Sequence, residues 1–267
     1  MNKGSSLQEA YLSRLKKQRR KIMAARILLA LALFLLWETA ADKSWIDSFF
    51  FSSPSRLARL FLSMWRDGSL FLHVGITLTE TLVSFALVVF IGLAVSLLLW
   101  LSDSVFQVLE PYLVILNSLP KSALAPLLIV WLGANQRTII VAGISVAIFG
   151  TILNLYTGFT ETSREKIRLI YTLHGTKKDA LIKVVLPSTV PMIISIMKVN
   201  IGLCLVGVVI GEFIGARNGL GYLIIYGSQV FQLDLVILSI LILCLMAMLL
   251  YGGVTAAEKF YHRRQHA

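Results

Sequence analysis

Long apolar segments dominate the hydrophobic pattern of this chain, and short polar segments separate them. A helix that crosses a bilayer needs about 20 mostly apolar residues. Six segments fit this length, at residues 22–41, 79–101, 105–132, 138–159, 191–213 and 233–254. These segments are too long for barrel strands, and they lack the alternation of apolar and polar positions that such strands show. The pattern therefore predicts an all-α, polytopic membrane protein with about six transmembrane helices.

A shorter amphipathic pattern lies between the first two apolar segments. Ser53 is a candidate N-cap, Pro54 suits the first helical turn, and Gly68 can end the helix. We expect an amphipathic helix on a membrane surface, which serves either as a contact for a partner or as interfacial packing. Its apolar side chains recur at helical spacing, at Leu57, Leu60, Phe61 and Met64.

The stretch between the fourth and fifth apolar segments carries signals for two short helices. Residues 162–165 (Thr-Ser-Arg-Glu) and 176–179 (Thr-Lys-Lys-Asp) each form the pattern of a capping box. Gly175 is the expected left-handed residue between the helices, and Leu186-Pro187 is expected to end the second one. Two capped helices around a tight turn form a rigid knuckle, which suits docking of a partner better than a simple linker would.

The composition agrees with a membrane protein. Hydrophobic residues make up 57% of the 267 residues, charged residues make up 15%, and the mean hydropathy is +0.79. Soluble domains contain about 45–50% apolar and about 25% charged residues. The apolar excess is larger than a water-soluble core of this size can bury, so the bilayer is the natural solvent for the remainder.

The distribution of basic residues predicts the orientation of the spans. Seventeen of the 25 Lys and Arg residues lie in residues 1–26, between the fourth and fifth spans, or after the sixth span, and six lie on the opposite side. Because the richer side is cytoplasmic, both termini are predicted in the cytoplasm. The basic head, residues 1–26, also fits a nucleic-acid-binding segment or the start of a signal peptide. The many later spans favour a topology anchor that is retained as the first helix, with no nucleic-acid partner.

The knuckle resembles the cytoplasmic motif of permease subunits from type I ABC importers. Val184 and Leu186-Pro187 match the second half of that motif. The first half departs from it, because His174 stands at the glycine of the family and residues 168–170 (Arg-Leu-Ile) stand at its Glu-Ala-Ala.

Two further stretches resemble the same family more closely. Residues 120–133 (PKSALAPLLIVWLG) look like the third-span signature of permeases from the nitrate, sulfonate, taurine and bicarbonate group. Residues 211–224 (GEFIGARNGLGYLI) resemble the stretch that follows the fifth span in that group. Together, the resemblances extend over residues 50–255.

The resemblance implies an assembly of several parts without a cofactor. Two permeases, expected to be identical copies, form a pathway in the lipid of the bacterial inner membrane. Two cytoplasmic ATPase subunits drive transport, and an external binding protein delivers the solute. That solute is expected to be an anion of the sulfonate, nitrate or taurine type, or a related small organic compound. The knuckle is the implied coupling helix on the ATPase, and the residues expected to take part are Leu173, His174, Gly175, Thr176, Lys177, Asp179, Leu186 and Pro187.

The resemblance also suggests a division of the chain into domains. Residues 1–21 form a basic cytoplasmic tail, and residues 22–69 hold the first span and a periplasmic amphipathic helix. Residues 70–256 form a type I transmembrane domain, and residues 257–267 form a second cytoplasmic tail.

Ionisable residues within or beside the spans are candidates for function, because they are costly in hydrocarbon. Glu212 ends the fifth span and faces the pathway or the partner permease, or lies at the membrane interface. Lys121 and Lys198 either line an anion route or extend to the headgroups. Glu80, near the end of the second span, is expected to be interfacial.

Prolines and glycines provide the remaining pathway or dimer-interface candidates. Pro120 and Pro126 are expected to kink the third span, since neighbouring helices can satisfy the freed carbonyls. Gly207, Gly211 and Gly215 form a smooth stripe that permits close helix approach, either between two permeases or within one chain.

No group of residues suggests catalysis or a metal site in this chain. The phosphate-binding pattern GxxxxGK[ST] is absent, so ATP hydrolysis is expected on a separate subunit. The four histidines and two cysteines have no metal-ligand spacing. An ion-coupled secondary transporter is the alternative function, and a membrane scaffold is a third. The capped knuckle and the proline-broken third span favour the importer permease.

Overall fold

The computed structural model describes residues 3–265, and the regular structure of these residues is entirely helical. This confirms the predicted all-α fold. Five helices are long and apolar enough to cross a membrane, and one bent helix pair raises the number to six if it counts as one span. Contacts divide the chain into two compact units, residues 1–63 and residues 64–267, which are described separately.

The first unit consists of a long helix followed by short ones. The indole N–H of Trp37 donates a hydrogen bond to the carbonyl of Phe51 at 3.2 Å, and the N–H of Ser55 donates to the Glu38 carboxylate at 3.0 Å. Ser53 caps the third helix, because its hydroxyl accepts from a first-turn N–H at 3.4 Å. The helices are α1 (Lys3–Asp42), α2 (Ser48–Phe51) and α3 (Pro54–Arg66), the last of which runs into the second unit.

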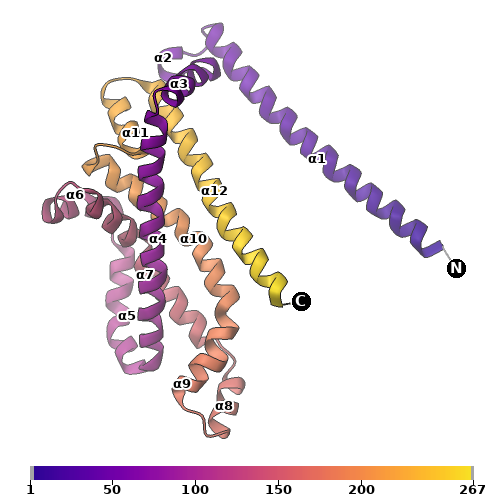
Figure 1. The fold of residues 1–267 in the computed structure, drawn as a ribbon, viewed down its shortest axis with the longest axis vertical. Coiled ribbons are helices and arrows are strands. Elements are labelled where there is room, and N and C mark those ends of the chain that lie inside the picture. Colours follow the sequence, from indigo (N-terminus) through magenta and orange to yellow (C-terminus); the bar gives the residue numbers. More distant parts are fainter. Residues whose placement is uncertain (1–2, 266–267) are drawn as a thin grey trace. The chain divides into compact units, whose positions relative to one another are not determined.

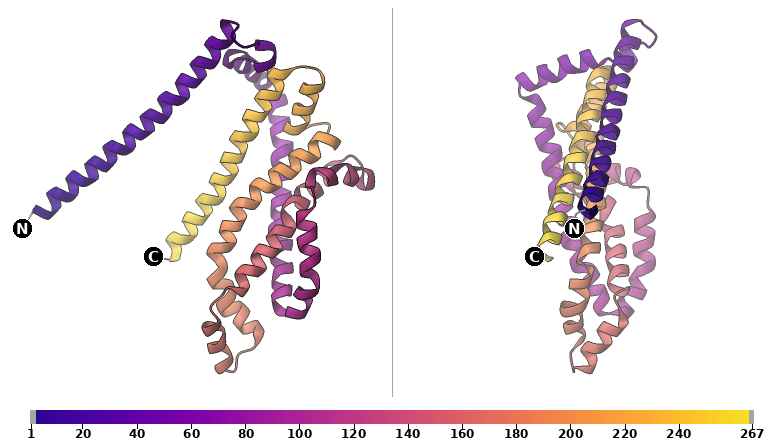
Figure 2. Two further views of the ribbon diagram at one scale, coloured as in Figure 1. Left: turned by 180° about the vertical axis from the view of Figure 1, so that it is seen from behind. Right: turned by 90° about the vertical axis from the view of Figure 1, so that its right-hand side faces the viewer.

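The second unit is a bundle of long helices with short helices at its two ends. Figure 1 shows α8 and α9 together at one end and α11 at the other, and both views in Figure 2 keep this order. We call these ends the α8 end and the α11 end. The elements are α4 (Ser69–Leu101), α5 (Asp103–Ser118), α6 (Lys121–Leu132), α7 (Gln136–Thr160), α8 (Arg164–Thr172), α9 (Lys177–Ala180), the π-helical turn η1 (Leu181–Val185), α10 (Leu186–Gly215), α11 (Leu220–Gln229) and α12 (Leu233–Gln265).

The centre of this bundle is α7, which packs extensively against α4 and α10. The face of α4 that points inward carries small and polar residues, which lets the helices approach closely. A Cβ atom at Gly92 would lie 2.8 Å from the Thr151 methyl group, so glycine is required there. The hydroxyl of Ser84 donates to the Ile140 carbonyl of α7 at 3.1 Å.

The third predicted span is broken into α5 and α6, whose axes differ by 96°. Pro120 occupies the N-cap position of α6, where its fixed φ of −66° suits the turn. Helix α6 continues through Pro126 to Leu132, so the sharp turn lies at Leu119-Pro120 and not at Pro126.

Leu186-Pro187 does not end a helix, contrary to the prediction. The helical run continues from Lys177 to Gly215 through the π turn η1. In this turn the N–H of Leu186 donates to the carbonyl of Leu181, which is an i→i+5 bond. The wider turn accommodates Pro187, which has no N–H and would disturb a regular α-helix.

The two predicted capping boxes have different outcomes. Helix α8 starts one residue later than expected, with Ser163 at the N-cap, and the hydroxyl of Thr162 is buried without a hydrogen-bond partner. The first box is therefore wrong. The second is confirmed, because Thr176 accepts from the Asp179 N–H at 3.2 Å and its own N–H donates to Asp179 at 2.9 Å.

Candidate functional site

The turn between α8 and α9 closes with a well-defined hydrogen-bond pattern. The N–H of His174 donates to the carbonyl of Tyr171 at 3.0 Å, and the N–H of Gly175 donates to the carbonyl of Ile170 at 2.8 Å. These two bonds form a Schellman motif, which requires a left-handed residue at its centre. That residue is His174, with φ +59°, so the prediction of a left-handed Gly175 is wrong. The residue that must be left-handed therefore stands at the position where the family motif carries glycine.

Gly175 is nevertheless required, because the chain passes close to α8 at this point. A Cβ atom on Gly175 would lie 2.5 Å from the Cγ2 atom of Ile170 and 2.9 Å from its carbonyl oxygen. Glycine is therefore needed here because the backbone passes close to Ile170, and not because the residue has a left-handed conformation.

Leu173 lies at the apex of this turn and is 69% exposed. The turn is fixed from both sides by the Schellman motif and by the Thr176–Asp179 capping box. The arrangement presents one apolar side chain on a stiff support at the α8 end of the bundle.

Lys177 connects this turn to the start of α5. Its ammonium group lies 3.6 Å from the Asp103 carboxylate and 5.4 Å from the ring centre of Trp100. Behind it, Ala180 and Val185 are fully buried in an apolar cluster that includes Trp100. The segment that follows the turn is thus anchored to the α8 ends of α4 and α5.

At the other end of α5, the broken span places Lys121 beside the bundle. Its ammonium group donates to the Leu116 carbonyl at 2.6 Å and lies 5.3 Å from the ring centre of Phe149. Lys121 thereby binds a carbonyl in the last turn of α5 and helps to hold the break.

A cavity of ≈ 170 Å³ lies between α5, α7 and α10, halfway along the last two helices. The side-chain nitrogen of Asn200 is buried without a hydrogen-bond partner. No charged side chain lines this cavity, which we call the amide pocket. Its polar lining consists of Asn117, Thr151, Asn154, Ser195 and Asn200.

Lys198 does not line this pocket. Its ammonium group forms an ion pair with the Glu258 carboxylate of α12, and both side chains are largely buried. The partner neutralises the lysine within the chain.

Glu212 is enclosed at the α11 end, with 1% of the residue exposed. Its carboxylate accepts from the hydroxyl of Thr77 at 2.6 Å and from the N–H of Gly221 at 2.6 Å. A Cβ atom at Gly219 or Gly221 would lie 2.3 Å and 2.7 Å, respectively, from a Glu212 oxygen. Glu212 thus holds the turn into α11, and no surface of it is free for a solute or a second permease in this conformation.

The glycine stripe of α10 faces other helices of the same chain. A Cβ atom at Gly207 would lie 2.8 Å from Gly143, and one at Gly211 would lie 3.2 Å from Ile139, both on α7. At Gly215 it would lie 2.8 Å from Ile129 of α6. These contacts correspond to packing within one chain, which was one of the two interpretations of the stripe; the other was a contact between two permeases.

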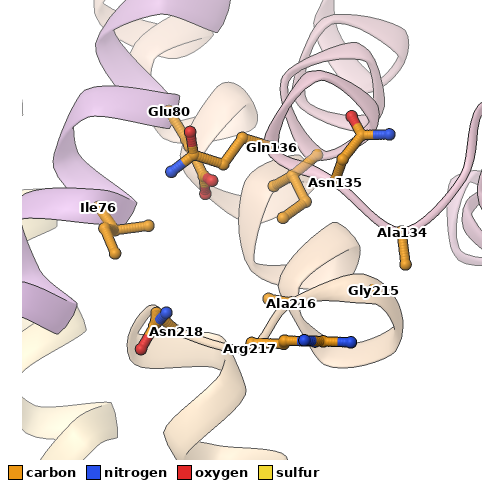
Figure 3. A pocket seen from close by; sticks show the side chains of 10 residues that line it. Ile76, Glu80, Ala134, Asn135, Gln136, Gly215, Ala216, Arg217 and Asn218 are labelled. Atoms are coloured by element: carbon orange, nitrogen blue, oxygen red, sulfur yellow. The ribbon is translucent and has the colours of Figure 1, made fainter.

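Glu80, which the sequence suggested at the membrane interface, is buried inside the bundle at the α11 end. It is 2% exposed, and neither carboxyl oxygen has a hydrogen-bond partner among residues 3–265. It lines a second cavity of ≈ 170 Å³ at the α11 end, which we call the Glu80 pocket (Figure 3). Gln136, Arg217 and Asn218 also line this pocket.

Sequence reasoning missed the amide pocket and the Glu80 pocket. A signal for the second was present, since His73, Thr77, Glu80 and Ser84 recur on one face of a helix that is otherwise apolar. The amide pocket brings together residues from three helices, and no local pattern indicates that they meet.

Comparisons with known proteins agree with these features. Residues 88–264 match the family described as binding-protein-dependent transport system inner membrane component. A probable ABC transporter permease protein of Haemophilus influenzae is 30% identical over 85% of this chain and 92% of its own length. The taurine transport system permease protein of Escherichia coli is 25% identical over 85% of this chain and 84% of its own length. Among solved structures, an inward-facing methionine ABC transporter superposes with a TM-score of 0.60 at 19% identity, over 69% of this chain and 92% of that one.

Proposed function

The chain belongs to the family of binding-protein-dependent transport system inner membrane components, and we propose that it lines the route of a small solute through an ABC importer. It is a multi-pass permease subunit of such an importer. The proposed solute is an anion of the sulfonate, nitrate or taurine type, or a related small organic compound. The similarity to a taurine permease supports this range.

The observation that carries the proposal is the amide pocket. Polar groups at the middle of apolar helices are costly unless they serve a purpose. Here five polar side chains from three helices line a cavity of ≈ 170 Å³. Thr151 and Asn200 are buried, and the amide nitrogen of Asn200 lacks a partner among the described residues. Neutral N–H and O–H groups can donate to the oxygens of a small solute without holding it by a full charge, which favours release.

The coupling role proposed for the α8–α9 turn rests on its connection to this pocket. Leu173 would dock in a groove of an ATPase subunit, and the stiff turn would transmit its displacement. Lys177 joins the turn to Asp103 at the start of α5, and Asn117 near the end of α5 lines the amide pocket. A movement of the turn would therefore displace one wall of the pocket through a single helix.

The assembly and orientation are also proposals. The basic residues of the two terminal segments and of the segment around α8 and α9 support cytoplasmic termini and an external α11 end. In this orientation, a second permease completes the pathway, an external binding protein delivers the solute at the α11 end, and two ATPase subunits dock at the α8 end.

The test replaces the pocket amide at Asn154 by leucine, which has a similar size and no hydrogen-bonding group. We expect Asn154→Leu to lower taurine uptake by the reconstituted complex about tenfold, the effect of losing roughly 1.4 kcal/mol of binding. Gln229→Leu, which removes an exposed amide on α11, is the control and should transport like the parent. Equal uptake by both variants would contradict a solute route through the amide pocket.

A further inference from the structure

The Glu80 carboxyl group is the least satisfied ionisable group at the α11 end. It is 2% exposed, and both of its oxygens lack hydrogen-bond partners among the described residues. A buried carboxylate without a partner is strongly unfavourable, so the group requires either a proton or a positive charge.

The neighbouring Glu212 increases the need of Glu80 for a proton or a positive charge. Its carboxylate is already bound by the Thr77 hydroxyl and the Gly221 N–H, and it lies beside the N-terminus of α11. These donors and the helix dipole offset part of the cost of burying a negative charge on Glu212. Glu80 has no such donors, and its polar neighbour is the Glu212 carboxyl group, which repels an ionised Glu80 unless the two groups share a proton.

The Glu80 pocket gives a small cation access to this group. The pocket forms where α4, α7 and α10 come together, and it has a volume of ≈ 170 Å³. Figure 3 shows Gln136 and Asn218 around it, whereas the guanidinium group of Arg217 extends away from Glu80. The amide oxygens of Gln136 and Asn218, which line the pocket, can accept from N–H groups.

We propose that the Glu80 pocket binds the ammonium group of an amine-bearing solute as it enters the permease. An ammonium group supplies both the positive charge that Glu80 lacks and N–H donors for the neutral amides. The inference rests on the proposed uptake function and narrows its solute to a molecule with an amino group, such as an aminosulfonate. The amide pocket would then receive the oxygen-rich end of the same solute deeper in the membrane.

The first experiment examines the pocket without any partner subunit. The purified full-length permease is heated with methylammonium chloride or with NaCl of equal ionic strength. Once methylammonium exceeds its Kd several-fold, it should raise the unfolding midpoint of the parent by about 2–4 °C relative to NaCl. Glu80→Gln keeps the size of the side chain and removes its charge, so it should abolish this difference. Asp42→Asn, which removes an exposed acid, should retain it.

An equal response of the parent and Glu80→Gln to methylammonium, or no response in the parent, would overturn the ammonium site. In that case Glu80 carries a proton instead. The unfolding experiment does not involve transport, so it tests the ammonium site whether or not the proposed solute range is correct.

The second experiment identifies the source of the ammonium group by comparing taurine with isethionate, in which a hydroxyl replaces the amine. In vesicles containing the reconstituted complex and saturating binding protein, Glu80→Gln should raise the half-saturating taurine concentration about tenfold and leave isethionate uptake unchanged.

Equal effects of Glu80→Gln on taurine and isethionate uptake would overturn the assignment of the ammonium group to the solute. So would a change only in the amount of binding protein needed, because the cation would then be a basic side chain of that protein. A parent complex that transports neither solute would count against the proposed solute range alone, since the methylammonium result is independent.

Discussion

The hydroxyl of Thr77 on α4 donates a 2.6 Å hydrogen bond to the carboxylate of Glu212 on α10, although the two residues are 135 positions apart. The same hydroxyl oxygen accepts from the N–H of Leu220 at 2.8 Å. One side chain therefore joins the end of α4, the end of α10 and the first turn of α11. This small buried network fixes the α11 end of the bundle.

We expect Thr77→Val to destabilise the permease, because valine has the shape of threonine but neither donates nor accepts. The change removes the hydroxyl that donates to one Glu212 oxygen and accepts from the Leu220 N–H, while the Gly221 N–H still donates to the other Glu212 oxygen. Losing a hydrogen bond to a charged group costs about 1.5–3 kcal/mol. Thermal unfolding in detergent measures the effect. Thr79→Val is the matched control, since the exposed Thr79 hydroxyl bonds only within its own helix, to Gly75. Similar midpoints for the two variants would show that the network contributes little.

The sequence predicted the helices well, because long apolar segments and capping residues are local signals. The pairing of Glu212 with Thr77 could not be predicted in this way, since it depends on how α4 and α10 pack. The same limit applies to the amide pocket, where Asn117, Asn154 and Asn200 come from separate helices. The sequence placed the left-handed residue at Gly175 because glycine adopts that conformation most easily. The hydrogen bonds of the turn instead place it at His174.

The glycine stripe gives a second prediction about packing. Gly211→Leu should lower the free energy of unfolding by about 1–3 kcal/mol, because its side chain would overlap Ile139 and Ala142 of α7. Gly202→Leu on the same helix is the control, since a Cβ atom there meets no atom within 4 Å. Folded yield and thermal unfolding of the two variants provide the comparison. If Gly211→Leu folds like the control but no longer forms a dimer, the stripe contributes to a contact between permeases instead.

The orientation of the spans can be tested at the end of α12. A reporter fused after residue 267 should behave as cytoplasmic, because segments rich in Lys and Arg favour the cytoplasmic side and the C-terminal segment is one of them. A second reporter, inserted at Asn218 between α10 and α11, should behave as external. Labelling of both positions from the same side would contradict the proposed topology.

The turn between α8 and α9 makes opposite predictions for two adjacent residues. His174→Gly should be tolerated or slightly stabilising, since a left-handed conformation costs a non-glycine residue about 1–2 kcal/mol. Gly175→Val should instead disrupt the turn, because its Cβ would lie 2.9 Å from the Ile170 carbonyl oxygen. Thermal unfolding and copurification of the ATPase subunit measure both effects. A destabilised His174→Gly together with a normal Gly175→Val would mean that the left-handed residue is Gly175 after all.

The coupling role of Leu173 leads to the last prediction. A leucine that is 69% exposed at the apex of a fixed turn can fill an apolar groove on a partner at little entropic cost. Leu173→Asp would place a charge in that groove, where desolvation is unfavourable. Because the side chain has few contacts within its own chain, the permease itself should still fold and insert. We therefore expect the reconstituted complex to lose ATPase copurification, or to hydrolyse ATP without solute uptake. Leu173→Met keeps the apolar contact and should retain both activities. If Leu173→Asp binds the ATPase and transports solute like Leu173→Met, another part of the α8 end must couple the two subunits.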